Sequence, residues 1–319
     1  MRVIEVENLA KSYGGVSALT DLSFGCLEAS TLAVLGPNGA GKTTAVKILA
    51  TLLRADGGQA FVDGIDVAAH PREVRARIGL TGQYAAVDER LTGRENLELV
   101  GRLLRLGSKE SAARAADLLT QLRLSDASDR VSKGYSGGMR RRLDIAMSLI
   151  GRPSVLFLDE PTTGLDPRSR LEMWDLIDDL VRGGTTMLLT TQYLDEADRL
   201  ADSIVVIDHG HAIATGTAEQ LKQDIGGDRV VLTLSEPSQR AAAASAMSPF
   251  AVAAPRDGDH DAELIIPVKP TTTLVEVLRC LDRASVGVSD IEMRRPTLDD
   301  VFFRLTGSTT SQETVDDDR

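Results

Sequence analysis

A strand, a glycine-rich loop and a helix in succession constrain this fold more than any other feature of the sequence. Residues Gly36 to Thr43 read Gly-Pro-Asn-Gly-Ala-Gly-Lys-Thr and fit the pattern G-x-x-x-x-G-K-[ST]. The apolar run Thr31–Leu35 predicts a strand before the loop, and residues 44–53 predict a helix after it. This context identifies a phosphate-binding loop, because glycines let backbone N–H groups converge on phosphate oxygens at a helix N-terminus. A plain glycine-rich turn is the alternative.

The side chains at the end of the loop have separate expected roles. Lys42 is expected to place its charge at the β- and γ-phosphates. The hydroxyl of Thr43 is expected to serve Mg²⁺, and Thr44 is expected to reach the α-phosphate. The backbone around the phosphates is expected to come from Gly36, Pro37, Asn38, Gly39, Ala40 and Gly41.

Two carboxylates follow a second apolar strand. Residues Val155–Asp159 predict a buried strand, with Asp159 at its carboxyl end and Glu160 directly after it. Ligands of open α/β sheets bind at this edge. We expect Asp159 to hold Mg²⁺ through its water shell and Glu160 to polarise an attacking water. Two acids that merely cap a strand are the alternative, which the phosphate loop makes the weaker one.

The first 225 residues alternate between predicted strands and helices. Strands are expected at 3–6, 22–26, 31–35, 59–62, 78–81, 155–159, 186–190 and 204–207. Helices are expected at 44–53, 92–106, 111–122 and 168–181, the second of them starting with a capping box of Thr92 and Glu95. The alternation predicts an α/β core with a partly parallel sheet.

The pattern changes at residues 226–306, which predict a small α+β domain. Strands are expected at 230–234 and 264–268, and a helix plus a loop at 241–255. A further helix is expected around residues 274–281, with one apolar face. A last short helix is expected at 297–305, capped by Thr297 and Asp300. The polar tail at 307–319 is expected to be disordered. The predicted apolar face consists of Leu274, Val275, Leu278 and Leu281.

Composition narrows the class of protein. Lys and Arg number 36 against 47 Asp and Glu, a net charge of −11, and aromatic residues make up 3 %. The charge argues against a protein that coats nucleic acid, although it leaves room for a local basic patch, and the few aromatic residues argue against a stacking platform for single strands. No apolar stretch approaches the roughly 20 residues of a spanning helix, and the charges near Met1 do not fit a signal peptide. We expect a cytosolic chain with free Cys26 and Cys280 unless a partner recruits it to a membrane.

A second candidate anion site lies about a hundred residues after the phosphate loop. Tyr135-Ser136-Gly137-Gly138-Met139 leads into a predicted helix, and its serine and glycines lie at the helix N-terminus. Two phosphate-binding elements in one chain suggest that a second copy completes each site. Three arginines follow at 140–142. By themselves they fit a nucleic-acid patch, whereas the family resemblance described next implies the solvated and interfacial side of the helix.

Residues 1–225 resemble the nucleotide-binding domains of ABC transporters, since several motifs occur in order. Residues 135–139 resemble the family's signature motif, with Met139 where Gln is commoner. The resemblance implies a P-loop NTPase fold with a helical subdomain at about 84–150. It further implies that Tyr13 stacks on adenine and that Gln83 links Mg²⁺, the attacking water and the membrane partner. Gln192 occupies the place of a histidine that contacts the γ-phosphate; its amide donates a hydrogen bond but carries no charge. The D-loop is matched by Gly164, Leu165 and Asp166.

Four segments resemble the daunorubicin/doxorubicin-resistance type of ATPase subunit in particular. They are residues 79–88, 135–145, 190–198 and 295–302, the last of which lies in the C-terminal domain. This type implies export of an amphipathic substrate, such as an antibiotic or a lipid. The family's C-terminal regions support dimerisation, so the helix carrying Leu298, Val301, Phe302 and Phe303 is either a self-association surface or packs within its own domain.

The resemblance implies a mechanism and a set of partners. Two copies would bind two ATP molecules head to tail, with Ser136 and Gly138 of one copy facing the phosphate loop of the other. Hydrolysis would open the dimer and drive a separate multi-spanning permease, which recruits the chain to the cytoplasmic side of the membrane. The coupling segment is expected around residues 83–97. Soluble ATPases that act on nucleic acid or ribosomes are the alternative class, and a nucleotide binder without hydrolysis is disfavoured by Glu160.

Overall fold

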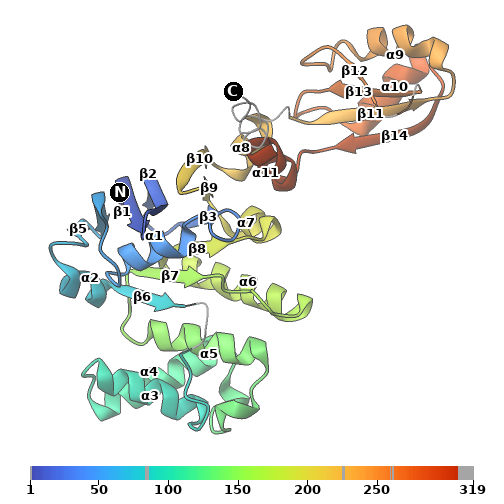
Figure 1. Ribbon diagram of the computed structural model, residues 1–319. Helices are drawn as coiled ribbons and strands as arrows, with labels where there is room; N and C mark the ends of the chain where they lie inside the picture. The colour runs from blue at the N-terminus through green and yellow to red at the C-terminus, as the bar shows by residue number, and fades with distance from the viewer. Residues whose placement is uncertain (1, 83–85, 225–226, 259, 261, 308–319) are drawn as a thin grey trace. The chain divides into compact units, whose positions relative to one another are not determined.

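The computed structural model describes residues 2–82, 86–224, 227–258, 260 and 262–307. The chain forms two compact units, Met1–Ala218 and Glu219–Arg319, which Figure 1 traces from blue to red. Gln83 and residues 308–319 of the predicted tail lie outside the described residues. No helix in the described ranges combines the length and apolar character that crossing a bilayer requires.

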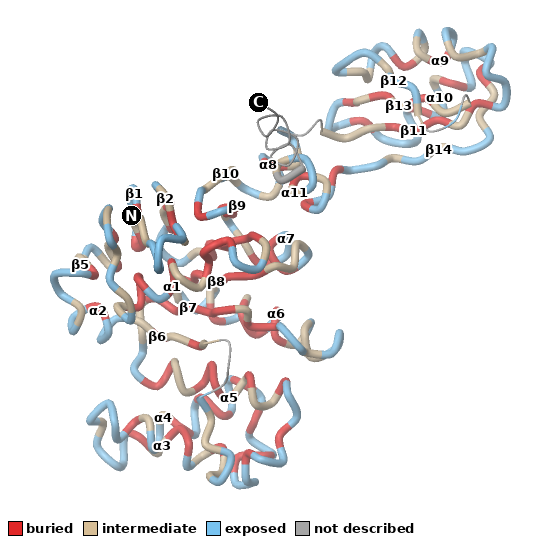
Figure 2. Tube along the Cα trace, in the orientation of Figure 1, coloured by how far each residue is buried: buried red, intermediate tan, exposed pale blue. Residues whose placement is uncertain are grey.

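A six-stranded sheet forms the core of the first unit, in the order β10-β9-β3-β8-β7-β6. All neighbouring strands pair in parallel except the edge pair of β9 and β10. Every residue of β3, β7 and β8 is buried (Figure 2), as expected for strands with both faces covered. The predicted parallel sheet is thus confirmed. Its strands are β3 (Thr31–Leu35), β6 (Ile78–Thr81), β7 (Val155–Asp159), β8 (Thr186–Thr191), β9 (Ser203–Asp208) and β10 (His211–Gly216).

A second, antiparallel sheet has the order β2-β1-β4-β5. The predicted strands at 3–6 and 22–26 are only the beginning of β1 and the end of β2, two 12-residue strands. The rest, residues 7–13 and 16–21, is exposed or half-buried except for Leu9 and Leu19. Pairing between the two strands extends them, with irregular register along their length. The strands of this sheet are β1 (Arg2–Tyr13), β2 (Val16–Leu27), β4 (Gly57–Val62) and β5 (Ile65–Asp66).

Four helices accompany these sheets. The predicted helix at 44–53 is shorter than expected, because α1 ends at Leu49 and the backbone turns left-handed at Thr51, with φ of 61°. Short helices before β6 and after β8 were not predicted, since neither has a long apolar period. The helices are α1 (Lys42–Leu49), α2 (Pro71–Arg77), α6 (Pro167–Arg182) and α7 (Leu194–Leu200).

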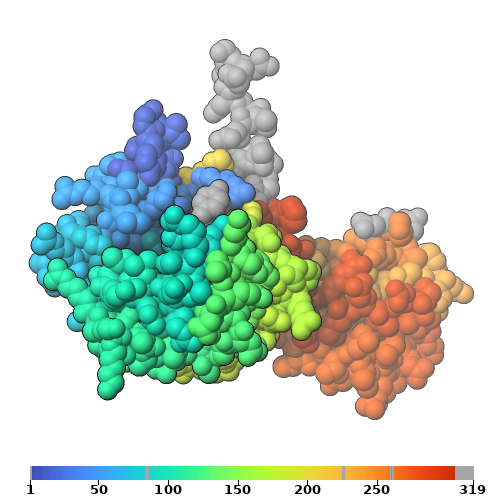
Figure 3. Space-filling model, turned by 90° about the horizontal axis from the view of Figure 1, so that it is seen from below, coloured from blue at the N-terminus to red at the C-terminus, as the bar shows by residue number. Residues whose placement is uncertain are grey.

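Three helices form a separate block within the first unit. They are α3 (Gly93–Leu103), α4 (Ser108–Gln121) and α5 (Gly137–Leu149). Their teal and green residues cover the face of this unit that Figure 3 presents. The predicted capping box at the start of α3 is confirmed, since Thr92 Oγ1 accepts from the Glu95 amide and Glu95 Oε2 from the Thr92 amide.

The second unit is an α+β domain around one antiparallel sheet of order β12-β13-β11-β14. Its buried core comes from β11, β13, α9 and α10. The capping pair of Thr297 and Asp300 at the last helix is confirmed. The strands and helices are β11 (Arg229–Leu234), β12 (Arg256–Asp257), β13 (Glu263–Pro267), β14 (Val288–Arg294), α8 (Ala218–Asp224), α9 (Arg240–Met247), α10 (Leu274–Arg283) and α11 (Leu298–Gly307).

The buried face of α10 differs from the prediction. Val277 and Leu281, one turn apart, are buried in the core of this unit. Leu274, Val275 and Leu278 are 37 %, 55 % and 41 % exposed. The prediction is therefore wrong for these three residues. An apolar side chain on a helix does not by itself mark the packed face.

Candidate functional site

The loop between β3 and α1 depends on glycine at two positions. A Cβ on Gly36 would collide with the carbonyl oxygen of Ile207 in β9. Gly41 has φ of 105°, and a Cβ there would lie 2.5 Å from the carbonyl oxygen of Ala18. Neither position accepts a side chain without a backbone shift. The neighbouring strands therefore fix the curvature of this loop.

Lys42 lies inside the curve of the loop. Its Nζ donates hydrogen bonds to the carbonyl oxygens of Gly36 at 2.7 Å and Pro37 at 3.0 Å. Burial lowers the pKa of Lys42, and the nearby carboxylates of Glu160 and Asp159 oppose that shift. The chain thus holds a buried ammonium group where the sequence predicts phosphate binding.

A cavity of about 270 Å³ lies against this loop. It joins the loop to the carboxylate that follows β7, so residues more than a hundred positions apart form one site. Seven of the predicted site residues line it, whereas nine others that the structure describes do not: Tyr13, Gly36, Pro37, Ala40, Ser136, Gly137, Gly138, Asp159 and Gln192. The lining residues are Ala18, Asn38, Gly39, Gly41, Lys42, Thr43, Thr44 and Glu160.

Asp159 lies at the carboxyl end of β7 and is 5 % exposed. The Thr43 hydroxyl lies 3.3 Å and 3.2 Å from its two carboxylate oxygens. Thr190 Oγ1, on the adjacent strand β8, donates to Asp159 Oδ1 at 2.5 Å. The structure therefore brings together Thr43 and Asp159, the two described residues predicted to serve a metal, and both offer the hard oxygen donors that Mg²⁺ prefers.

Glu160 has an uncommon backbone conformation, with φ of 50°. Its amide donates to both the carbonyl and the hydroxyl oxygen of Thr190 at 3.1 Å. Its carboxylate accepts from Thr163 Oγ1 at 3.2 Å and lines the cavity. Thr190 therefore holds both Asp159 and Glu160 in place. This role of Thr190 was not predicted from the sequence. A polar residue at the end of an apolar strand was the available signal.

Gln192 and Tyr13 lie apart from the cavity lining. Gln192 directly follows β8, and since Asp159 pairs with Thr190, it belongs to the same sheet edge as the carboxylates. Tyr13 ends β1 and is 47 % exposed, with Lys11 Nζ 5.8 Å from the centre of its ring. An exposed ring is available for stacking.

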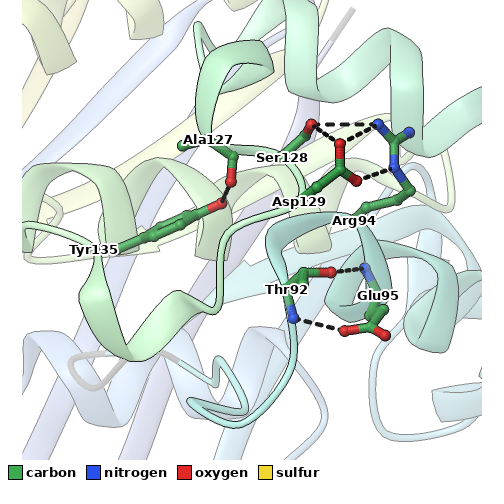
Figure 4. A network of polar contacts seen from close by, with 7 residues as sticks. All are labelled: Thr92, Arg94, Glu95, Ala127, Ser128, Asp129 and Tyr135. Carbon is green, nitrogen blue, oxygen red and sulfur yellow. Dashed lines mark hydrogen bonds and ion pairs between the residues drawn. The ribbon is translucent and has the colours of Figure 1, made fainter.

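The predicted second anion site begins α5. Ser136 is the N-cap of α5, and its hydroxyl accepts from the Met139 amide at 3.2 Å. Ser136 and Gly137 are exposed, while Gly138 is buried and a Cβ there would lie 2.9 Å from Ser169 Oγ. The preceding Tyr135 is buried, and its hydroxyl donates to the Ala127 carbonyl at 2.7 Å (Figure 4). This contact attaches the loop to the helical block.

The three arginines after this loop do not share one environment. Arg140 and Arg142 form ion pairs with Glu89 at 2.7 Å and Glu172 at 3.6 Å. Arg141 is 7 % exposed, so the prediction of a solvated or interfacial side is wrong for this residue. Its guanidinium binds carbonyl oxygens inside the unit instead. Arg141 also forms an i,i+3 ion pair with Asp144, a spacing that is common on exposed helix surfaces and therefore gave no signal of this burial.

Two protein-family models match the chain, one in each of its two units. The family model described as ABC transporter matches residues 19–163. The model described as ATP-binding protein DrrA1-3-like, C-terminal domain, matches residues 216–306. Daunorubicin resistance ATP-binding protein DrrA2 of Streptomyces coeruleorubidus is 54 % identical over 96 % of this chain and 96 % of its own length. The chain belongs to the ABC transporter family.

Two further relatives agree with this membership. Doxorubicin resistance ATP-binding protein DrrA of Mycobacterium tuberculosis is 45 % identical over 98 % of this chain and 96 % of its own length. A solved structure titled as the ATP-binding subunit of an ABC transporter has a TM-score of 0.63 and 28 % identity, covering 70 % of this chain and 93 % of its own. The predicted ABC-type P-loop fold with a C-terminal α+β domain is confirmed. As an ABC ATPase the chain binds and hydrolyses ATP.

Proposed function

We propose that this chain powers the export of drugs or other amphipathic molecules, as a head-to-tail dimer that binds two MgATP and drives a separate permease. The cavity that joins the glycine-rich loop to Glu160 carries the proposal, because it brings phosphate-binding groups and a carboxylate together at one sheet edge. The names of relatives at 45 % to 54 % identity favour a drug as the substrate.

In this proposal the loop residues bind the phosphates of ATP. The backbone N–H groups of residues 38–41 would donate to the β-phosphate, whereas Pro37 has no N–H to donate. The Lys42 ammonium would turn from the carbonyls of Gly36 and Pro37 toward the γ-phosphate. Thr44, the third residue of α1, reaches the α-phosphate. Tyr13 stacks on adenine, which its exposed ring favours.

Thr43 and Asp159 would hold Mg²⁺, a role that the short distance between their oxygens supports. When bound, Mg²⁺ neutralises charge on the phosphate oxygens. Glu160 orients the attacking water and accepts its proton, as a carboxylate at the rim of the cavity is able to do. Gln83 is also proposed to contact Mg²⁺ and the attacking water. Only its resemblance to a glutamine of the ABC family supports this role.

Gln192 is proposed to donate its amide hydrogen bond to the γ-phosphate. Gln192→His is expected to preserve ATP turnover or raise it several-fold, because an imidazolium stabilises developing charge better than a neutral amide. Steady-state phosphate release from purified protein measures this. Gln223→His, on α8 outside the first unit, is the matched control. An inactive Gln192→His variant beside an active wild-type chain would contradict the placement of Gln192.

The partners in this proposal are a multi-spanning permease and a second copy of the chain. Ser136 and Gly138 of each copy would face the phosphate loop of the other, and exposure of Ser136 favours such a contact. The permease would hold the complex at the cytoplasmic side of the membrane as a peripheral subunit. The C-terminal unit is proposed to support dimerisation. Its Phe303 is 72 % exposed, whereas Leu298 and Val301 are buried and therefore unavailable.

Purification of the tagged chain from native membranes in mild detergent tests the choice of partner. Mass spectrometry is expected to find a multi-spanning protein without an ATPase domain, in an amount comparable to the chain. The same preparation from cells that carry an untagged chain is the control. Ribosomal proteins or nucleic acid, without a membrane protein, would instead favour an ATPase that acts on those partners.

A further inference from the structure

Arg141 and Asp144 form a buried ion pair on α5, one turn after Gly138. Arg141 Nη1 lies 3.3 Å from Asp144 Oδ2, and the side chains are 8 % and 4 % exposed. Burial lowers the pKa of Arg141 and raises that of Asp144, so it disfavours the charged form of each. Such a pair is weak evidence for a gain in stability. A gain in stability therefore does not account for the pair, and the hydrogen bonds that Arg141 and Asp144 make to the backbone point to another role.

The guanidinium of Arg141 binds the backbone on both sides of Glu160. Nη2 donates to the carbonyl oxygen of Asp159 at 2.8 Å, and Nε donates to that of Pro161 at 3.0 Å. The residue between them has the left-handed conformation described above. One side chain on α5 thus holds the peptide group that precedes Glu160 and the peptide group that follows Pro161, and so restrains the backbone that carries the Glu160 carboxylate.

The same pair also binds the backbone on both sides of residues 83–85. Arg141 Nη1 donates to the carbonyl oxygen of Gly82 at 2.6 Å. Asp144 Oδ1 accepts from the amide of Ala86 at 2.9 Å. The two ends of this segment are therefore attached to one turn of α5. Arginine suits this task because its planar fork reaches several acceptors at once, which a lysine ammonium cannot do with the same geometry.

We propose that Arg141 and Asp144 are a positioning pair that links the helix beginning at Ser136 to the backbone around Glu160 and to that of Gly82 and Ala86. The inference rests on the proposed function, in which Ser136 contacts the nucleotide of the partner copy. A shift of α5 on that contact moves the carbonyls of Gly82, Asp159 and Pro161 together, since Arg141 binds all three. Binding of ATP to the phosphate loop of one copy would in this way affect the position of Glu160 in the other copy.

Two variants test the pair. Arg141→Lys retains the charge beside Asp144 but loses the fork that binds three carbonyls. The double variant Arg141→Met with Asp144→Asn removes both charges, so no unpaired charge stays buried. We expect kcat for ATP to fall about tenfold to a hundredfold, as for a misplaced catalytic group, while KM and the affinity for ATP in calorimetry change by less than about threefold. Melting temperatures verify folding, and if the double variant is unfolded, Arg141→Lys decides.

Arg94→Lys is the matched control, because Arg94 also pairs with an aspartate of the first unit, with Nε 2.8 Å from Asp129 Oδ1 (Figure 4). Its kcat is expected to equal that of the wild type. A folded Arg141→Lys variant with wild-type kcat overturns the inference, as does a loss of ATP affinity as large as the loss of kcat. Glu160→Gln is measured in parallel: if that variant remains active, the proposed function fails, whereas an inactive Glu160→Gln beside an active Arg141→Lys overturns the positioning pair alone.

Discussion

Glu160→Gln is expected to slow ATP hydrolysis by about a hundredfold to ten-thousandfold, the usual contribution of a general base, and to leave ATP binding intact. The amide keeps the shape of the carboxylate but does not accept a proton from water. Steady-state phosphate release measures the rate, and calorimetry measures the affinity for ATP. Glu73→Gln is the control, since Glu73 on α2 has a largely exposed side chain beside His70.

The same variant is expected to accumulate as an ATP-bound dimer. If two copies enclose two ATP molecules and hydrolysis opens them, blocking hydrolysis stabilises the closed form by mass action. Light scattering coupled to size exclusion, with and without saturating ATP and Mg²⁺, reports the mass. A strictly monomeric profile with ATP would count against sites shared between copies, even where the loss of turnover is as expected.

Lys42→Ala is expected to lower the affinity for ATP by at least about tenfold and to bring turnover to background. Removal of a charge-assisted hydrogen bond to phosphate costs about 1.5–3 kcal/mol. The fold should tolerate the change, because burial already disfavours the charged form of Lys42. Calorimetry with ATP and the rate of phosphate release measure the two effects.

Lys47→Ala is the matched control for this variant, because Lys47 lies on the same helix α1 and is exposed. Its affinity for ATP and its turnover should equal those of the wild type. Unchanged turnover in Lys42→Ala would remove the phosphate loop from the proposed mechanism.

The elements that the sequence predicted best have strong local signals. The strands Thr31–Leu35, Ile78–Thr81 and Val155–Asp159 were predicted with their observed bounds, because each is a short apolar run. The starts of α3 and α11 followed from their capping residues. These features depend on neighbours within a few positions of the chain.

The features that were missed depend on distant partners. Residues 7–13 of β1 and 16–21 of β2 lack a regular apolar alternation, and pairing with neighbouring strands extends β1 and β2 beyond the predicted bounds. Which side of α10 is buried depends on packing against the core of its unit. Burial of Arg141 depends on the carbonyl groups of Gly82, Asp159 and Pro161, and no pattern in the sequence near Arg141 predicts these contacts. In the site, the phosphate-loop motif identified Lys42 and Thr43, and the apolar strand at 155–159 identified Asp159, whereas the role of Thr190 required the order of the strands.

The central position of β3 has a consequence for synthesis of the chain. β3 lies between β8 and β9, so the strand that leads into the phosphate loop has no neighbour in its sheet until residues 186–208 exist. Ile207, whose carbonyl packs against Gly36, belongs to the last of these segments. Pairings of such long sequence separation form late in folding. A ribosome-bound nascent chain should therefore gain nucleotide binding only after β9 has emerged, although the phosphate loop itself left the ribosome much earlier.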